Sequence, residues 1–323
     1  MKLTRLNLVL LVLSLVLGGI ALATRERAKG HRTEERAFGA FDPATILRVS
    51  ITDRRNEDAP SLVLVRDSSE TEWKVEARSA YPAEVYPLER LFARISNLTV
   101  GDQVAEAEGS LGMFGLAPGM GLGIEMASPG TAPWKFVVGS PGAAAGGFLR
   151  TEGETRIFGV PGYVQLSCEP RQWLQPKLFH FDTSLVRRVE LTLAGELLVL
   201  ARDDKGIWRE SETGRVAPRV ALEDLIGDLT AMALFDLAPR TTTPSAAGFD
   251  DGGLQLGLLD ADGTSLADFA LVLSRRADEA GHGFVRSGAW SAAGHPEWIG
   301  LIDAALGDAV MARVTTILTA LGG

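Results

Sequence analysis

Short apolar strands followed by an apolar helix face occur twice along this chain, in the same order. RVSIT at residue 48 matches RVELT at 188, and LVLVRD at 62 matches LVLARD at 198. Trp73 then matches Trp208, and FLR at 148 matches FVR at 284. The separations between matched residues range only from 134 to 140. Because small loop insertions in a duplicated unit produce such a drift, the pattern predicts one structural unit used twice.

Each copy is predicted to contain several strands and one amphipathic helix. The helix face consists of Leu88, Leu91, Phe92, Ile95 and Leu98 in the first copy and of Leu222, Leu225, Ile226, Leu229 and Met232 in the second. Such three- and four-residue spacings are typical of one buried helix face. Strands are expected at 46–52, 62–66, 121–126, 134–138 and 147–151, then at 186–193, 197–202, 254–259, 269–274 and 283–287, with a further strand at each tryptophan. Short turns such as DADG after Leu259 favour antiparallel pairing.

The N-terminal segment is apolar from Leu6 to Ala23, a run of 18 residues. This length approaches the roughly 20 residues that a membrane-spanning helix needs. ALA at 21–23 also fits the cleavage site of a secretory signal, but the run exceeds the usual signal core of about 7–15 residues and a basic stretch, TRERAKGHR, follows it. An uncleaved anchor is therefore favoured, and both alternatives place the body outside the cytoplasm. Basic residues flank both ends of the run, so the positive-inside rule alone does not give this orientation.

The predicted fold class is α+β: two tandem copies of a mainly antiparallel sheet with one helix packed on a face, preceded by an N-terminal transmembrane helix. The expected organisation is a membrane anchor at 1–24, a basic linker at 25–40, a first repeat unit at 41–180 and a second at 181–323. The second unit is expected to end in a helix from Glu297 to Leu321, with Trp298, Ile302, Leu306, Val310 and Val314 at helical spacing.

Composition excludes several classes of protein. A net charge of -9 disfavours nucleic acid as a partner, because no basic patch is visible outside the N-terminal flank. The single cysteine, Cys168, allows no intramolecular disulfide and no cysteine-rich metal site. We predict Cys168 to be a packed small residue, since no histidine lies near it in the sequence.

Candidate catalytic and ligand-binding motifs are weak. No two of His31, His180, His282 and His295 have the spacing of a helical metal pair. The glycine-rich stretch 139–147 lacks the Lys-Ser/Thr ending of a phosphate loop, and GMGLG at 119 misses the dinucleotide pattern. The carboxylate pairs Asp250-Asp251 and Asp260/Asp262 fall in expected turns, and no G-x-S-x-G elbow occurs. No catalytic, cofactor-binding or metal residue is therefore predicted, and no cofactor. The two matched tryptophans are predicted to be core residues, each packed on the helix of its own copy: Trp73 on Leu91 and Ile95, and Trp208 on Leu225 and Leu229.

Several motifs give the chain a resemblance to a known family. They are FDPATILRVSIT, EWKVE, LFARISNL, LGMFGLAP, and VVG followed by GGFLR. With these the chain resembles the domain of unknown function 4340 family of membrane-anchored bacterial proteins, well over 41–180 and more weakly through the second copy. Members are often companions of gliding-motility-type ABC exporters, so the resemblance implies an accessory role in the cell envelope. Where the family often has tyrosine before the final strand, this chain has Phe148 and Phe284, which places any tyrosine-based role there in doubt.

The favoured hypothesis is a non-enzymatic envelope protein, anchored by one N-terminal span in the bacterial inner membrane with its soluble body on the extracytoplasmic side. It would act as an accessory or interaction subunit of a membrane complex, with an ABC exporter as the expected partner. The alternative is an envelope-polymer hydrolase or a ligand-binding protein that uses a cleft between the two repeat units.

Overall fold

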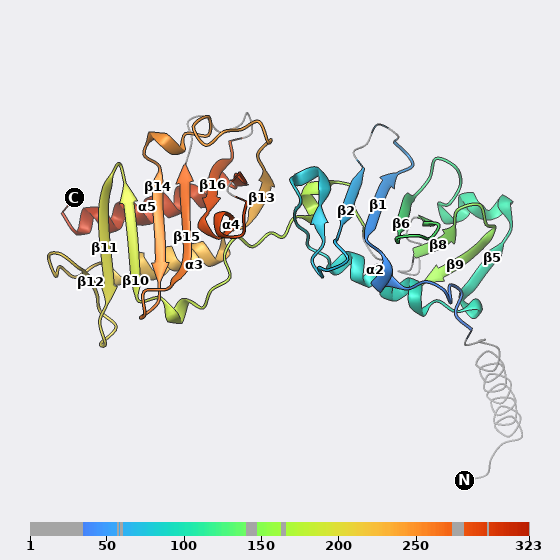
Figure 1. Cartoon of the computed structure of the whole chain (residues 1–323), viewed down its shortest axis with the longest axis horizontal. Helices are drawn as coiled ribbons and strands as arrows, with labels where there is room; N and C mark the ends of the chain where they lie inside the picture. Colours follow the sequence, from blue (N-terminus) through green and yellow to red (C-terminus); the bar gives the residue numbers. More distant parts are fainter. Residues whose placement is uncertain are drawn as a thin grey trace, which may run out of the picture. The chain divides into compact units, whose positions relative to one another are not determined.

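The described part of the chain forms two compact units, shown in the computed structural model of Figure 1. The structure describes residues 35–56, 58, 61–139, 147–162, 166–272, 281–295 and 297–322. Unit 1 contains the described residues up to Thr71 together with Val85–Cys168, and unit 2 contains Glu72–Glu84 and Glu169–Gly323. One short segment of the first copy, Glu72–Glu84, therefore groups with unit 2, and the sequence repeat does not reveal this. The predicted anchor at 1–24 lies outside the described residues. Among the residues that are described, none of the helices has the length and hydrophobicity of a membrane span.

Unit 1 is built on an antiparallel sheet. Its strands are β1 (Arg48–Asp53), β2 (Leu62–Val65), β5 (Gln103–Glu106), β6 (Leu122–Ala127), β7 (Trp134–Val138), β8 (Gly147–Thr151) and β9 (Arg156–Val160). They run in the order β2-β1-β6-β7-β8-β9-β5. Side chains alternate along β1, where Val49 and Ile51 are fully buried and their neighbours are not. One face of this sheet therefore carries the core.

A helix and a group of aromatic side chains cover the core face of unit 1. Helix α2 (Tyr86–Asn97) begins with Pro87 in its first turn and buries the four residues Leu88, Leu91, Phe92 and Ile95. Phe38 and Phe41, which precede the short 3-10 helix η1 (Pro43–Thr45), lie against Phe136 at ring-centroid distances of 5.3 and 6.1 Å. The ordered body thus includes residues that the sequence assigned to the linker.

Unit 2 repeats this sheet. Its strands are β10 (Arg188–Leu193), β11 (Glu196–Arg202), β12 (Trp208–Glu210), β13 (Leu234–Leu237), β14 (Leu254–Leu259), β15 (Ser265–Val272), β16 (Gly283–Ser287) and β17 (Gly300–Ile302). From β11 onward they run in the order β11-β10-β14-β15-β16-β17-β13, which matches unit 1 strand for strand. The register also matches, since Val49 lies opposite Leu64 and Met126 while Val189 lies opposite Leu200 and Leu258. The common fold predicted from the repeat is confirmed.

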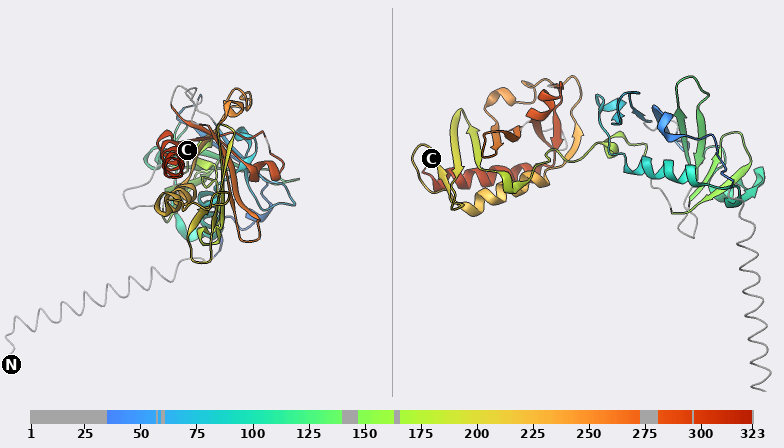
Figure 2. Two further views of the ribbon diagram at one scale, coloured as in Figure 1. Left: turned by 90° about the vertical axis from the view of Figure 1, so that its left-hand side faces the viewer. Right: turned by 60° about the horizontal axis from the view of Figure 1, so that its bottom comes forward.

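Two long helices cover the core face of unit 2. Helix α3 (Arg219–Ala231) is the counterpart of α2, and α5 (Ala304–Ala320) packs beside it along the same face of the strands (Figure 2). A short third helix, α4 (Gly288–Ala292), follows β16. The remaining 3-10 helices are η2 (Glu76–Arg78), η3 (Val100–Asp102), η4 (Glu108–Phe114), η5 (Pro170–Trp173), η6 (Thr183–Leu185) and η7 (Phe249–Asp251).

The prediction of one C-terminal helix from Glu297 was wrong at its start. Residues 299–302 are all buried, and Gly300–Ile302 forms β17 between β16 and β13. Because β17 is buried on both faces, its apolar run lacks the alternation that marks a half-exposed strand. The helix begins after Asp303, whose side chain accepts a hydrogen bond from the Ala305 N–H at 2.8 Å.

The segment Glu72–Glu84 belongs to the first copy by sequence and to unit 2 by packing. It forms a hairpin of β3 (Lys74–Val75) and β4 (Tyr81–Pro82), and Ser79 and Ala80 at its tip have positive φ angles of 58° and 56°. The tip residue Ser79 receives two hydrogen bonds from unit 2: Trp298 Nε1 donates to its carbonyl oxygen at 3.2 Å, and Arg240 Nε donates to its hydroxyl at 2.9 Å. Non-glycine residues in this conformation need such support from their surroundings.

An ion pair and an aromatic cluster hold the same hairpin. Arg78 donates to both carboxylate oxygens of Asp236 at 2.7 and 3.1 Å, and both side chains are largely buried. Tyr81 lies edge-on to Trp290 and within 4.9 Å of Trp298, measured between ring centroids. Burial raises the pKa of Tyr81 to about 12. We call this segment the docked hairpin.

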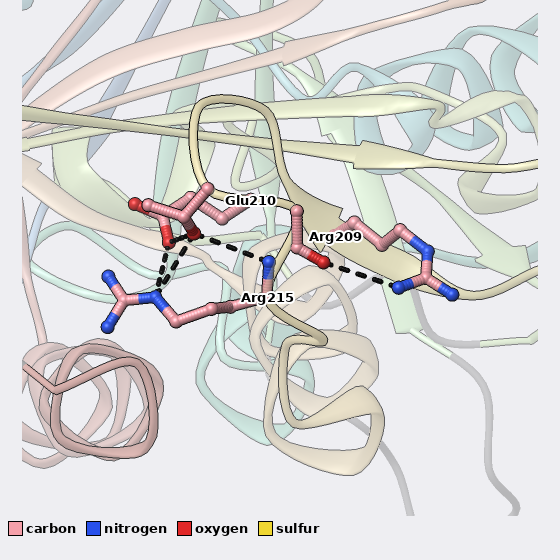
Figure 3. A network of polar contacts seen from close by, with 5 residues as sticks. Arg209, Glu210 and Arg215 are labelled. Carbon is pink, nitrogen blue, oxygen red and sulfur yellow. Dashed lines mark hydrogen bonds and ion pairs between the residues drawn. The ribbon is translucent and has the colours of Figure 1, made fainter.

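The corresponding hairpin of the second copy holds its own turn. Arg209 of β12 pairs with Val216 as an isolated bridge, and its Nη1 donates to the Gly214 carbonyl at 3.2 Å. Within the turn, Glu210 accepts hydrogen bonds from Thr213 and from Arg215 Nε, the latter at 2.9 Å (Figure 3). These contacts come from within residues 209–216, and the Ser211 N–H also donates to the Val199 carbonyl of the neighbouring β11 at 2.9 Å.

Candidate functional site

A polar cavity lies on the face of the second sheet opposite α3 and α5. Along β10 the side chains of Val189 and Leu191 are buried, whereas Glu190 and Thr192 point to this other face. The cavity has a volume of about 400 Å³. Its polar lining comes from four strands and from α4: Glu190, Thr192, Gln255, Asp268, Arg286, Ser287 and Ser291. We call it the β-face pocket.

Two acidic side chains and one basic side chain set the charge of the β-face pocket. Glu190 forms an ion pair with Arg188 at 2.7 Å, and it extends over Gly257, which leaves room for it. The carboxylate of Asp268 lies directly against Gly288, where any side chain would collide with it. The guanidinium of Arg286 lies 5.7 Å from the ring centroid of Phe249. The pocket therefore offers hydrogen-bond donors and acceptors, and charges of both signs.

Ser287 adds a buried hydroxyl to this pocket. Its side chain is 3% exposed, and its Oγ has no hydrogen-bond partner among the described residues. Buried polar atoms are nearly always hydrogen-bonded, so such an atom beside a cavity is a candidate contact for a bound group.

The matched arginine of the first copy has a structural role. Arg150 corresponds to Arg286, but it is buried and donates hydrogen bonds at 3.3 Å to the carbonyls of Leu116, Thr151 and Glu154. Burial lowers the pKa of Arg150, and the nearby Arg54 charge lowers it further. In the first copy this arginine therefore organises backbone, whereas in the second it lines a pocket.

The histidines do not converge on a common site. His180 is exposed, and His282 stacks on Phe235 at a centroid distance of 4.1 Å. His295 stacks on Trp298 at 3.9 Å, and its Nδ1 lies 3.4 Å from a carboxylate oxygen of Glu297. The Glu297 pKa is lowered, first by its own backbone N–H and then by His295. His31 lies outside the described residues. Both stacked rings serve aromatic packing.

The other residues considered from the sequence also have structural surroundings. Cys168 is a free, half-buried thiol. Asp260 accepts hydrogen bonds from the backbone N–H groups of Asp262 and Thr264, as expected in a turn. Residues 140–146 of the glycine-rich stretch lie outside the described part. Within that part, no group of three or more His, Cys, Asp and Glu side chains is placed to hold a metal ion.

Both tryptophans singled out from the repeat are buried, as predicted. Trp73 is 5% exposed and Trp208 is 1% exposed. Trp208 lines a small cavity together with Ile226 of α3, and its expected packing on Leu225 and Leu229 stays a prediction. Trp73 groups with unit 2 and α2 with unit 1, so the expected packing of Trp73 on Leu91 and Ile95 stays a prediction.

Sequence reasoning did not single out the residues of the β-face pocket. Arg286 was visible only as part of the FLR/FVR match, which indicated a shared strand and not a site. Glu190 and Asp268 lie at positions where a strand on an open face is expected to be polar. Only the pairing of β10, β14, β15 and β16 shows that these side chains gather in one place.

The fold and this pocket define a class of protein: two antiparallel α+β units of one topology, the second with a polar, mixed-charge pocket on its open face. Residues 73–252 match the model of the family described as domain of unknown function (DUF4340). Since this match covers more than half of the 323 residues, the chain belongs to that family. The match begins at Trp73 and continues into the second copy, so the second copy contributes more to it than the sequence motifs indicated. No curated protein and no solved structure matches the chain.

Proposed function

We propose that this protein is a non-enzymatic accessory subunit of a membrane complex in the bacterial cell envelope, with an ABC exporter as its partner. In this proposal the apolar run from Leu6 to Ala23 anchors it in the inner membrane, and both units lie on the extracytoplasmic side. Members of this family often look like companions of gliding-motility-type ABC exporters, and this supports the choice of partner.

The observation that carries the proposal is the β-face pocket. It is open, polar and of mixed charge, and Glu190, Asp268 and Arg286 line it from three different strands. Protein interfaces use hydrogen bonds and complementary charges of this kind for specificity and orientation. An adjoining exposed side chain, Leu197, supplies apolar area at the rim. The proposed contact is a protruding loop of the partner that carries charges of both signs.

Site-specific photo-crosslinking in cells tests this proposal. A photoreactive amino acid at Gln255 would lie in the pocket, and the matched control is Glu125, an exposed position on the corresponding face of the first sheet. We expect Gln255 to crosslink to a membrane protein of a transport complex and Glu125 to crosslink much less. The double variant Asp268→Asn, Arg286→Gln should abolish the Gln255 adduct while leaving the protein folded. Equal crosslinking from both positions, or none from Gln255, would count against the proposal.

A small polar ligand is the second candidate occupant, and the unpartnered Ser287 hydroxyl favours it. In that case the Gln255 probe would give no protein adduct, and the purified protein would carry a co-purifying small molecule that mass spectrometry detects.

A further inference from the structure

A second site in unit 2 follows from the arginine of the repeated strand motif. Arg66 is the fifth residue of LVLVRD and Arg202 is the fifth residue of LVLARD, and the two occupy the same place in their sheets. The Arg66 N–H donates to the Leu47 carbonyl at 2.9 Å, and the Arg202 N–H donates to the Arg187 carbonyl at 2.8 Å. The backbone is therefore equivalent, and any difference lies in the side chains.

In the first copy this arginine holds the turn that enters the sheet. The Nη2 atom of Arg66 donates to the carbonyls of Pro43, Ala44 and Ile46 at 3.3, 2.8 and 2.8 Å. These carbonyls belong to η1 and to the residue that caps its end. Three convergent acceptors define a position for one guanidinium.

In the second copy a different arginine has taken over that role. The Nη1 atom of Arg187 donates to the carbonyls of Ser184 and Val186 at 2.7 and 3.2 Å. Ser184 and Val186 correspond to Ala44 and Ile46, and the residue matched to Arg187 is Leu47, which cannot donate. The Arg202 side chain is thereby released from the turn, and its guanidinium forms no hydrogen bond or ion pair with any described residue.

The released guanidinium lies over a tryptophan with an unused donor. Arg202 Cζ is 5.9 Å from the ring centroid of Trp208. Trp208 is 1% exposed, and its Nε1 has no hydrogen-bond partner in the described part of the chain. A buried donor left in this state is rare in proteins and indicates a place for an acceptor.

Cavities adjoin both residues. One of about 270 Å³ is lined by Thr183, Ser184, Arg202, Trp208, Glu223 and Ile226. A wider one of about 790 Å³ shares Ser184 and Arg202 with it. A guanidinium, an indole N–H and two hydroxyls, all donors, thus surround space that a small group can enter.

Two of the nearby acidic side chains are already engaged, while Asp204 and Asp260 also line the wider cavity. Asp203 accepts hydrogen bonds from the backbone N–H groups of Lys205 and Ile207, which lower its pKa. Glu223 pairs with Arg219 at 2.8 Å. They leave Arg202 unpaired, but they reduce the local positive potential, so binding should be weak and sensitive to salt.

We propose that Arg202, Trp208, Thr183 and Ser184 form a binding site for a phosphate group. Arginine recognises phosphate through paired N–H donors, and a tetrahedral oxyanion can accept from donors that approach from several directions. The group belongs to a soluble phosphate compound or to a lipid headgroup. The site is independent of the β-face pocket and of the proposed partner.

Indole N–H resonances provide the test. The full chain, labelled with ¹⁵N at its six tryptophan indoles and held in an uncharged detergent, is titrated with inorganic phosphate against chloride of equal ionic strength. The Trp208→Phe variant assigns the Trp208 signal. We expect that signal alone to shift in a saturable manner, and Arg202→Gln to weaken the response at least tenfold. The control Arg156→Gln removes the same charge from unit 1 and should leave the response unchanged.

A second variant and a lipid arm complete the test. Arg187→Leu restores the residue pattern of the first copy, so Arg202 should return to the turn carbonyls and the phosphate response should fall without unfolding. Repeating the measurement in nanodiscs with and without phosphatidic acid separates the sources: a response to free phosphate identifies a soluble ligand, and a response only to the anionic lipid identifies a headgroup. A shift that chloride reproduces, a shift that survives Arg202→Gln, or no shift in either arm would overturn the proposal.

Discussion

The two units cover the same face of the same sheet with different material. In unit 1 the rings of Phe38 and Phe41 lie on Phe136 beside α2, whereas in unit 2 the helix α5 buries Val310, Val314 and Ile317 beside α3. Both solutions remove a large apolar area from water, which is the main requirement of such a sheet. The two copies therefore share the order of their strands, but they differ in the helices and aromatic side chains that pack on the sheet.

The ends of matched strands differ in a second way. In unit 1 Arg66 and Arg150 are both used to bind backbone carbonyls, while their counterparts Arg202 and Arg286 line cavities in unit 2. The second copy thus places at cavities the arginines that the first copy uses on backbone. This difference underlies the proposal that unit 2 carries the binding surfaces, and the following predictions test the packing of the two copies.

The largest effect is expected from the matched tryptophans. Trp208→Ala and Trp73→Ala should each lower the free energy of unfolding by about 3–5 kcal/mol, because each removes a buried ring. Since Trp73 groups with unit 2, both variants should increase amide hydrogen exchange in unit 2. Exchange mass spectrometry resolves the location. If Trp73→Ala instead loosened α2 and β1 alone, the assignment of the docked hairpin to unit 2 would be wrong.

A smaller effect should separate the two hairpins. Arg78→Ala leaves the largely buried Asp236 carboxylate without its partner and should cost about 1–3 kcal/mol. Arg215→Ala removes a half-exposed guanidinium but leaves the Glu210 carboxylate with the Thr213 hydroxyl as a donor, so it should lower stability less than Arg78→Ala. Arg78→Lys keeps the charge but loses the two-point contact, so its loss should be intermediate. Equal losses for Arg78→Ala and Arg215→Ala would show that the docked hairpin is no better held than its free counterpart.

The smallest effect concerns alkaline stability. The pKa of Tyr81 is about 12 in the folded protein and about 10 in an unfolded chain. Its contribution is therefore complete below pH 10 and is lost as the pH rises through 12, because the unfolded state releases the proton first. Tyr81→Phe should flatten this part of the profile of urea midpoint against pH. An identical slope between pH 10 and 12 in both proteins would contradict the burial of this phenol.

Local pattern was enough for the strands and helices whose residues match between the two copies. Leu88, Leu91 and Ile95 marked α2, and the LVLVRD and LVLARD motifs marked β2 and β11 within one or two residues. The short edge strands β5 and β13 were not predicted, because they have only four residues each and follow closely after a 3-10 turn or a helix. β17 escaped because burial on both faces removes the alternation of a strand.

The residues of the two proposed sites were harder to infer, because their position beside one another depends on the pairing of distant segments. The place of Arg286 in the β-face pocket becomes evident only from the pairing of β16 with β15, which carries Asp268. The release of Arg202 did leave a signal in the sequence: ILRVSIT aligned with VRRVELT places Arg187 where the first copy has Leu47. An added arginine beside a matched arginine indicates that one of them has a new role. The grouping of residues 72–84 with unit 2 left no such signal.

The docked hairpin also imposes an order of events during synthesis. Trp298, which bonds to the hairpin tip, lies 217 residues after Tyr81. At about 5–20 residues per second, the hairpin waits roughly 10–45 s before its last partners leave the ribosome. Through that interval Tyr81 lacks the Trp298 ring and the Ser79 carbonyl lacks its indole donor, so a chain interrupted before Trp298 leaves this part of the hairpin exposed. Such truncated products carry a recognisable mark for chaperones and proteases that the finished protein conceals.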